Sequence, residues 1–203
     1  MNNEKQLTRR DVVVIAGSLG AMDALRQIMT GLPEDFPASV LIVLHSSSTG
    51  PSTVLDILQR YTRLGVRYAT DGEKPEPGVI YLAVPDRHLE LAPPGVMKLT
   101  DGPKIRYARP SADRLFETAA TTFGSRVVSI ILSGGDGHGA DGARAIARAG
   151  GLTFVQDPFE AQAPSMPMYA LEHDDPALCL KAEELGTALL EAVRGNKDTK
   201  RDY

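Results

Sequence analysis

Three polar segments that can together perform nucleophilic chemistry each follow an apolar run of the sequence. Ser18 follows Val12-Val-Val-Ile-Ala-Gly, His45 follows Leu41-Ile-Val-Leu, and a glycine-rich loop with a histidine and two acids follows Leu132. A serine hydroxyl needs a base to lose its proton at neutral pH, and an imidazole base needs a third group that fixes its tautomer and stabilises its charged form. The sequence offers candidates for all three roles.

Ser18 stands at a predicted tight turn between a strand and a helix. The four β-branched residues 12–15 are typical of a strand buried on both faces of a parallel sheet, and apolar residues at helical spacing predict a helix over 21–30. A serine at such a turn is exposed beside unpaired amides, which can stabilise an oxyanion. We name the backbone amides of Leu19 and Gly135 as oxyanion donors, because neighbouring glycines let the main chain approach a substrate carbonyl.

Simpler explanations of the first two segments stay open. A serine ahead of a helix commonly caps it, and a glycine-rich turn after a first strand also suits phosphate binding. A dinucleotide site is disfavoured, because Gly17-Ser-Leu-Gly20 lacks the G-x-G-x-x-G spacing and the next strand carries no acid at its tip. His45 can also be a structural histidine that merely ends its strand.

The loop 133–142 contains the candidates for the third role. Asp136 and His138 join Ser18 and His45 as the predicted catalytic residues, since the carboxyl ends of parallel strands meet at one edge of the sheet. The third role has two kinds of candidate, because the loop offers both a carboxylate and an imidazole for it.

Two other interpretations of this loop remain. It can be a plain strand-to-helix turn, with Asp141 in the first helical turn where the helix dipole favours an acid. His45, Asp136, His138 and Asp141 can also be combined into a metal site. The metal hypothesis is weak, because no H-x-x-x-H or H-E-x-x-H pair lies on a helix, and we expect neither a metal nor a cofactor.

The elements that must position these residues predict an α/β fold. We expect a doubly wound, mainly parallel, Rossmann-like sheet with helices on both faces and an antiparallel hairpin insertion within residues 64–108. Strands are predicted at 12–16, 39–44, 127–132 and 152–155, helices at 21–30, 52–61, 111–123, 139–149 and 181–193, and the short alternating runs of the insertion at 79–82, 88–91 and 96–99.

Length and charge restrict the classes of function. The 203 residues fit one α/β domain, which we place at 11–193, with flexible tails at 1–10 and 194–203. The net charge of −4, with acids and bases interspersed, gives no footprint for nucleic acid, and no apolar run is long enough for membrane insertion. The single cysteine, Cys179, is expected to be a small buried hydrophobe, and a chain without disulfides fits the cytoplasm.

Taken together, these segments resemble the catalytic domain of the chemotaxis protein-glutamate methylesterases of the CheB type, from about residue 11 to residue 193. Each motif alone is weak, but all of them occur in the order of the family, which makes the resemblance specific. The matching segments are 15–25, 42–45, 79–89, 109–116, 131–134, 157–161 and 165–167.

The resemblance implies a serine hydrolase that removes methyl esters from glutamate side chains of chemoreceptors, with glutamine deamidation as a further activity. Ser18 is implied as the nucleophile and His45 as the general base and then acid. The implied partners are the cytoplasmic helices of chemoreceptors or another methylated protein. The chain resembles a stand-alone form without the family's N-terminal receiver domain, so a separate receiver domain is a further candidate partner.

One position departs from the family pattern and opens a second hypothesis. The family's acid is the seventh residue of Leu-Ser/Thr-Gly-x-Gly-x-Asp-Gly, and the seventh residue counted from Leu132 is His138. An imidazole brings no fixed negative charge, and neutralising the aspartate of a serine-protease triad lowers kcat about 10⁴-fold. The alternative function is therefore a catalytically impaired homologue that works as a binding or regulatory module.

Overall fold

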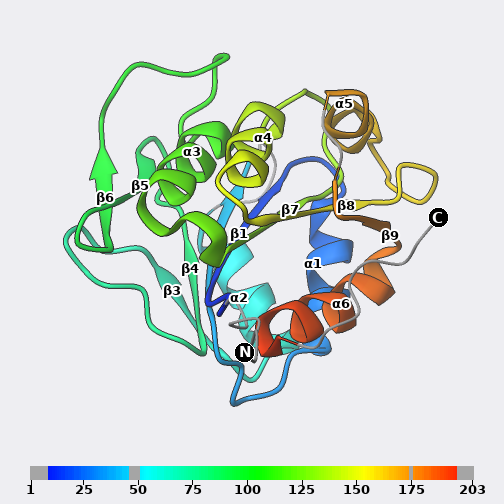
Figure 1. The fold of residues 1–203 in the computed structure, drawn as a ribbon, viewed down its shortest axis with the longest axis horizontal. Coiled ribbons are helices and arrows are strands. Elements are labelled where there is room, and N and C mark those ends of the chain that lie inside the picture. The colour runs from blue at the N-terminus through cyan, green and yellow to red at the C-terminus, as the bar shows by residue number, and fades with distance from the viewer. Residues whose placement is uncertain (1–8, 46–50, 174–175, 196–203) are drawn as a thin grey trace, which may run out of the picture.

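A parallel β-sheet forms the centre of the computed structural model, which describes residues 9–45, 51–173 and 176–195 (Figure 1). Within these residues the seven strands stand in the order β3-β4-β2-β1-β7-β8-β9, and every neighbouring pair is parallel. Their bounds are β1 (Val12–Gly17), β2 (Ser39–Leu44), β3 (Gly65–Tyr68), β4 (Val79–Leu82), β7 (Val127–Ile131), β8 (Leu152–Gln156) and β9 (Leu178–Leu180). The expected tails, 1–10 and 194–203, lie almost wholly outside the described residues.

Helices cover both faces of this sheet, which confirms the predicted doubly wound fold (Figure 1). Side chains of β1 alternate between the two cores: Val13 and Ile15 belong to one, and Val12 and Val14 to the other. The first core is covered by α1 (Ala21–Thr30), α2 (Pro51–Tyr61) and α6 (Ala182–Arg194), and the second by α3 (Ala112–Phe123), α4 (Ala140–Arg148) and α5 (Ser165–His173). A 3₁₀ turn, η1 (Gly124–Arg126), precedes β7.

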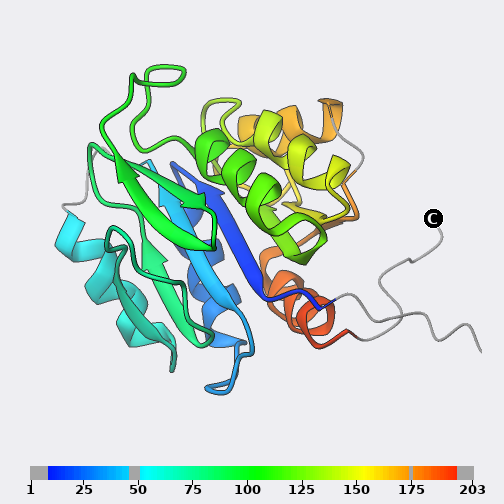
Figure 2. The ribbon, with the colours of Figure 1, turned by 60° about the vertical axis from the view of Figure 1, so that its left-hand side comes forward.

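The predicted hairpin insertion is correct only for its second half. Strands β5 (His88–Ala92) and β6 (Val96–Thr100) form an antiparallel pair of their own, which lies against α3 (Figure 2). The run 79–82, in contrast, is β4 of the main parallel sheet, where it pairs with β2 and β3. A four-residue apolar run fits either kind of sheet, so its strand partners had to come from the tertiary structure.

Two short elements near the C-terminal end were not predicted, namely α5 and β9. Helix α5, which contains Pro167 near its start, has little amphipathic pattern, so the apolar spacing did not reveal it. Strand β9 lies at the edge of the sheet, and Cys179 on it is exposed, so the expectation of a buried cysteine is wrong. Across the described residues, no helix combines the length and apolar character that a membrane span requires.

The order of the strands places a crevice beside β1. The chain leaves β1 through α1 toward β2 and leaves β7 through α4 toward β8, so the connections of these two neighbours run to opposite sides. In wound α/β sheets, ligands bind at the carboxyl ends of the strands where the order reverses in this way. The turn after β1 and the loop after β7 are the two segments that meet there.

Candidate active site

Ser18 lies in the turn between β1 and α1, at the carboxyl edge of the sheet. Its amide donates to the carbonyl of Ser133 at 2.9 Å, which joins this turn to the loop after β7. Helix α1 begins after Gly20, whose φ of 82° is left-handed, and no side chain caps the helix. Ser18 is therefore not a helix cap, and its hydroxyl instead donates to the main-chain carbonyl of His45 at 3.0 Å.

His45 follows β2 and is held at both its backbone and its ring. Its amide donates to the carbonyl of Gly17 at 3.0 Å, and its ring Nε2 lies 2.8 Å from the carbonyl oxygen of Pro110. Because a carbonyl oxygen only accepts, Nε2 carries the proton of the neutral ring, and Nδ1 is the basic nitrogen. The carbonyl of Pro110 thus fixes the tautomer, a task that a carboxylate performs in the serine-protease triad.

The four predicted catalytic residues line one cleft of about 780 Å³: Ser18, His45, Asp136 and His138. The convergence inferred from the sequence is therefore present in the structure. The detailed pairing differs, because the Ser18 hydroxyl meets the backbone carbonyl of His45 rather than its ring. Hydrogen bonds of catalytic groups are often long or poorly aligned before substrate binds.

His138 contacts the ring of His45 edge to face. The two ring centroids are 4.8 Å apart and the planes are nearly perpendicular, at 80°. His138 is only 5% exposed, and its Nδ1 is buried without a hydrogen-bond partner among the described residues. Its Nε2 lies 3.8 Å from the carboxylate of Asp136, whose side chain is 80% exposed. Asp136 thus stands at the solvent side of this pair of histidines.

Asp141 is engaged elsewhere and does not serve His45. Its carboxylate pairs with Arg106 and with Arg144, and Arg106 also donates to the carbonyl of Gly137 at 3.1 Å. Arg106 therefore fastens the segment after β6 to the loop that carries His138. Asp141 also lies in the first turn of α4, as the alternative interpretation of this loop expected.

The amides proposed as oxyanion donors remain available in the folded chain. Among the described residues, the backbone amides of Leu19 and Gly135 donate to no other group. Gly134 between the two segments is tightly packed: a Cβ there would lie 2.0 Å from Met166 Sδ and 3.1 Å from Ser18 Cβ. A glycine at this position keeps the loop close to the serine.

The metal hypothesis finds no support in the described part of the chain. No group of three or more histidine, cysteine, aspartate or glutamate residues in it is arranged to hold a metal ion. His45 and His138 contact each other through their rings, and Asp141 is bound to arginines.

The electrostatic surroundings of His45 lead to a prediction about pH. Burial lowers the pKa of His45 below 6.5, and the nearby His138 acts in the same direction, against the hydrogen bond to Pro110 and the charges of Asp136 and Asp113. His45 is then a neutral base at pH 7. We expect the acidic limb of kcat/KM to lie below pH 6.5, measured together with an NMR titration of the ring.

The lowered pKa of His45 also determines how the free energy of unfolding depends on pH. Below about pH 6.5 the unfolded chain binds a proton at residue 45 before the folded chain does, so the free energy of unfolding decreases as pH falls through this window. His45→Gln is the control, since it removes this titration. An acidic limb above pH 6.5 that follows the His45 signal would contradict the prediction.

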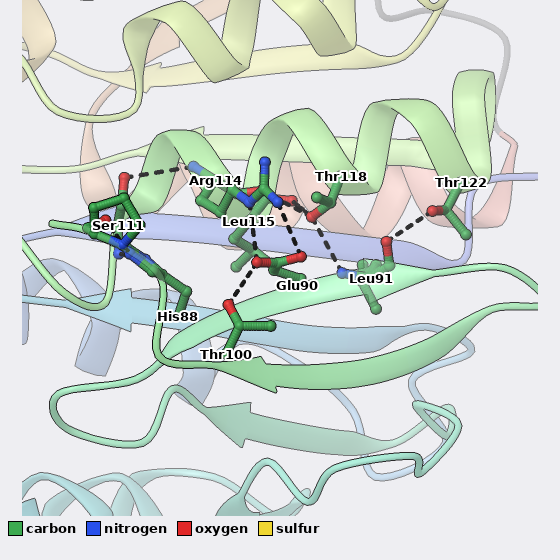
Figure 3. A network of polar contacts seen from close by, with 10 residues as sticks. His88, Glu90, Leu91, Thr100, Ser111, Arg114, Leu115, Thr118 and Thr122 are labelled. Carbon is green, nitrogen blue, oxygen red and sulfur yellow. Dashed lines mark hydrogen bonds and ion pairs between the residues drawn. The ribbon is translucent and has the colours of Figure 1, made fainter. Parts of the chain in front are cut away.

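Figure 3 shows a polar network around His88 that the sequence reasoning did not assign to the site. His88 is 2% exposed; its Nδ1 accepts from the Ser111 amide at 3.2 Å, and its Nε2 donates to the Pro103 carbonyl at 3.0 Å. Since Pro110 directly precedes Ser111, His88 fixes the segment whose carbonyl holds the His45 ring. The only sequence feature that pointed to His88 was its place in segment 79–89, which matches the family pattern.

The same network anchors the strand that carries His88. Glu90 on β5 accepts from Thr100 at 2.6 Å and from Arg114 at 3.0 Å. Burial acts to raise the pKa of Glu90, but the hydrogen bonds from Arg114 and Thr100 outweigh it and hold this pKa below its usual value. Arg109 pairs with Asp86 in a similar way, so these arginines are neutralised within the chain.

Comparisons with known proteins show which family the chain resembles. A family model described as CheB methylesterase matches residues 13–189. A putative protein-glutamate methylesterase/protein-glutamine glutaminase of Leptospira interrogans is 29% identical over 186 residues, covering 92% of this chain and 96% of the relative. A second relative, protein-glutamate methylesterase/protein-glutamine glutaminase 2 of Anaeromyxobacter dehalogenans, is 37% identical, covering 92% of this chain and 54% of the relative.

Two further matches concern Escherichia coli and a solved structure. The protein-glutamate methylesterase/protein-glutamine glutaminase of Escherichia coli is 35% identical over 168 residues, covering 81% of this chain and 48% of that protein. The crystal structure of the Thermotoga maritima CheB methylesterase catalytic domain superposes with a TM-score of 0.86 at 30% identity, covering 90% of this chain and 98% of that one. This chain thus spans about half the length of the Anaeromyxobacter and Escherichia relatives and nearly all of the Leptospira relative.

Proposed function

The chain belongs to the CheB methylesterase family, and from this premise we propose that it is a serine hydrolase that removes methyl esters from glutamate side chains of chemoreceptors. The observation that carries the proposal is the shared cleft of Ser18 and His45, with the serine on a strand-to-helix turn. The names of the relatives agree with the prediction of a carboxylic ester hydrolase. Glutamine deamidation is a second reaction of the same site, because it differs only in the leaving group.

The proposed reaction starts when the Ser18 side chain rotates from the His45 carbonyl to the His45 ring. The ring takes the hydroxyl proton as Oγ bonds to the ester carbonyl carbon, and the amides of Leu19 and Gly135 stabilise the resulting oxyanion. His45 then gives this proton to the methoxy group, and the C–O bond breaks to release methanol. Water, deprotonated by His45, hydrolyses the acyl-Ser18 ester and restores the serine.

The catalytic domain is proposed to extend over residues 11–193 and to work in the cytoplasm, where a chain with a single cysteine stays reduced. Its proposed substrates are the cytoplasmic helices of chemoreceptors or another methylated protein. A receiver domain on a separate protein is a candidate regulator. These statements extend the family resemblance and are open to direct binding measurements.

One observation favours the second candidate function, a catalytically impaired homologue that acts as a binding or regulatory module. His138 contacts the catalytic base where the family has an aspartate, and in this structure the Ser18 hydroxyl is bonded to a carbonyl instead of an imidazole. A chain with this site can keep the cleft for binding while losing turnover.

Labelling by a serine-directed fluorophosphonate tests the proposed chemistry without knowledge of the substrate. We expect the probe to modify Ser18, as read by peptide mass spectrometry, and the labelling rate to fall at least about 10²-fold in His45→Ala, because the hydroxyl then lacks a base. Ser165→Ala, at an exposed serine outside the cleft, is the control and should label as the wild type. Folded protein that resists the probe, or a rate indifferent to His45→Ala, would favour the binding module.

A further inference from the structure

Asp113 is a buried carboxylate in the first turn of α3, and only 3% of the residue is exposed. Its Oδ1 accepts a hydrogen bond from the Gly142 amide of α4 at 3.1 Å. Its Oδ2 is buried and has no hydrogen-bond partner among the described residues. A buried carboxylate oxygen without a partner is costly, so its retention needs an explanation beyond packing.

The Asp113 carboxylate lies at the N-termini of two helices. Asp113 lies at the N-terminus of α3, and through Gly142 it also caps α4, whose own N-cap, Gly139, offers no side chain. Helix N-termini carry partial positive charge and stabilise an anion. The two helices are in direct contact here, since a Cβ on Gly142 would lie 2.5 Å from Phe116 Cβ.

The segment that carries Asp113 also holds the catalytic base. The Pro110 carbonyl accepts from the His45 ring, and three residues later the Asp113 carboxylate is placed by the start of α3. On the other side, His138 precedes Gly139, where an added Cβ would lie only 3.5 Å from Ala112 Cβ, beside Asp113. The buried Nδ1 of His138 and the buried Oδ2 of Asp113 are both without partners among the described residues.

The charge of Asp113 reaches His45 through this low-dielectric interior. Burial lowers the pKa of His45, and the negative charges of Asp136 and Asp113 act in the opposite direction. Asp136 is 80% exposed, so solvent and salt screen its charge. Asp113 raises the pKa of His45 less than Asp136 does, but its charge is buried, so salt screens it much less.

We infer that Asp113 is a positioning carboxylate of this site, supplying to the His45 imidazolium the negative charge that the family's aspartate supplies from the position of His138. This inference rests on the proposed esterase function. Asp113 touches neither substrate nor the reacting atoms. It acts on the charged form of His45, which forms when Ser18 loses its proton.

The variant Asp113→Asn separates this role from helix capping, because the amide oxygen of asparagine can still accept from Gly142 while the charge is lost. We expect kcat for a glutamyl methyl ester to fall about 10²-fold, less than the 10⁴-fold of a directly bonded triad aspartate. The pKa of His45, followed by NMR, should fall, so the acidic limb of the rate profile moves to lower pH. Glu117→Gln, one turn along the same helix, is the matched control for charge removal.

A double-mutant cycle with His138→Asp distinguishes an electrostatic role of Asp113 from a purely structural one. A structural role would give the same loss of kcat in both backgrounds. Once residue 138 carries a carboxylate, Asp113→Asn should cost less than about threefold in kcat, because the two charges serve the same imidazolium. If Asp113→Asn does not fold, Asp113→Ser, which keeps an acceptor without charge, takes its place in the cycle. An equal loss in both backgrounds, or a His45 pKa unchanged by Asp113→Asn in folded protein, would overturn the inference.

The titration distinguishes this inference from the proposed function itself. If the wild type hydrolyses no ester but Asp113→Asn still lowers the pKa of His45, the esterase proposal fails and the coupling of Asp113 to His45 stands. If the wild type is active and Asp113→Asn matches it in kcat and in the acidic limb, the esterase proposal stands and Asp113 is only a helix cap.

Discussion

Ser18→Ala is expected to reduce methanol release from methylated chemoreceptor fragments at least about 10⁴-fold, to near the uncatalysed background. Ser18 is the proposed nucleophile at the turn between β1 and α1, so the loss of its hydroxyl removes the proposed covalent route. Water attacking with help from His45 and the oxyanion amides accounts for any residual rate. The measurement compares kcat of the wild type and the variant at saturating substrate.

The structure supplies a control for this experiment. Ser133, the other serine near this turn, is bound through its hydroxyl to the carbonyl of Leu19 at 2.7 Å and shapes the turn, so it is unsuitable. Ser165→Ala, outside the cleft, should retain full activity and the wild-type melting temperature. Ester hydrolysis that survives Ser18→Ala unchanged would mean that the nucleophile has been misassigned.

His138→Asp is the second change with a large expected effect, and it should raise kcat about 10-fold or more. The substitution places a carboxylate where His138 now contacts the His45 ring, with centroids 4.8 Å apart, and removes an imidazole that disfavours the imidazolium. The gain stays below the 10⁴-fold of a complete triad if Asp113 already supplies part of the charge. The measurement is kcat on the same methylated fragments.

His138→Asn is the matched control for this change, since it has the size of aspartate without its charge. We expect no gain from it, and some loss of stability in both variants because a buried ring is replaced by a smaller side chain. An equal gain in kcat in both variants would show that the smaller side chain, and not its charge, causes the gain. A wild type without turnover, together with an active His138→Asp variant, would identify the natural chain as the impaired homologue.

The comparison between Asp136 and Asp113 illustrates a general point about acids near a catalytic histidine. Asp136 lies close to His138 along the chain and was the obvious candidate from the sequence, yet its carboxylate is exposed and screened. Asp113 is 23 residues earlier in the chain and reaches the site only because α3 packs on α4. Nearness along the chain predicts which groups share a loop, and helix packing decides which distant charges are brought close to it.

The sequence by itself determined the fold class, the strand-to-helix turn at Ser18, the strand ending before His45 and the convergence of the loop with His138. These features are local, because hydrophobic period, glycine turns and the edge rule of parallel sheets depend on a few neighbouring residues. Only the tertiary structure decided that the Ser18 hydroxyl bonds to a carbonyl, that Pro110 holds the base, and that β4 belongs to the main sheet. Those outcomes depend on contacts between distant segments and on rotamers, which no spacing in the chain encodes.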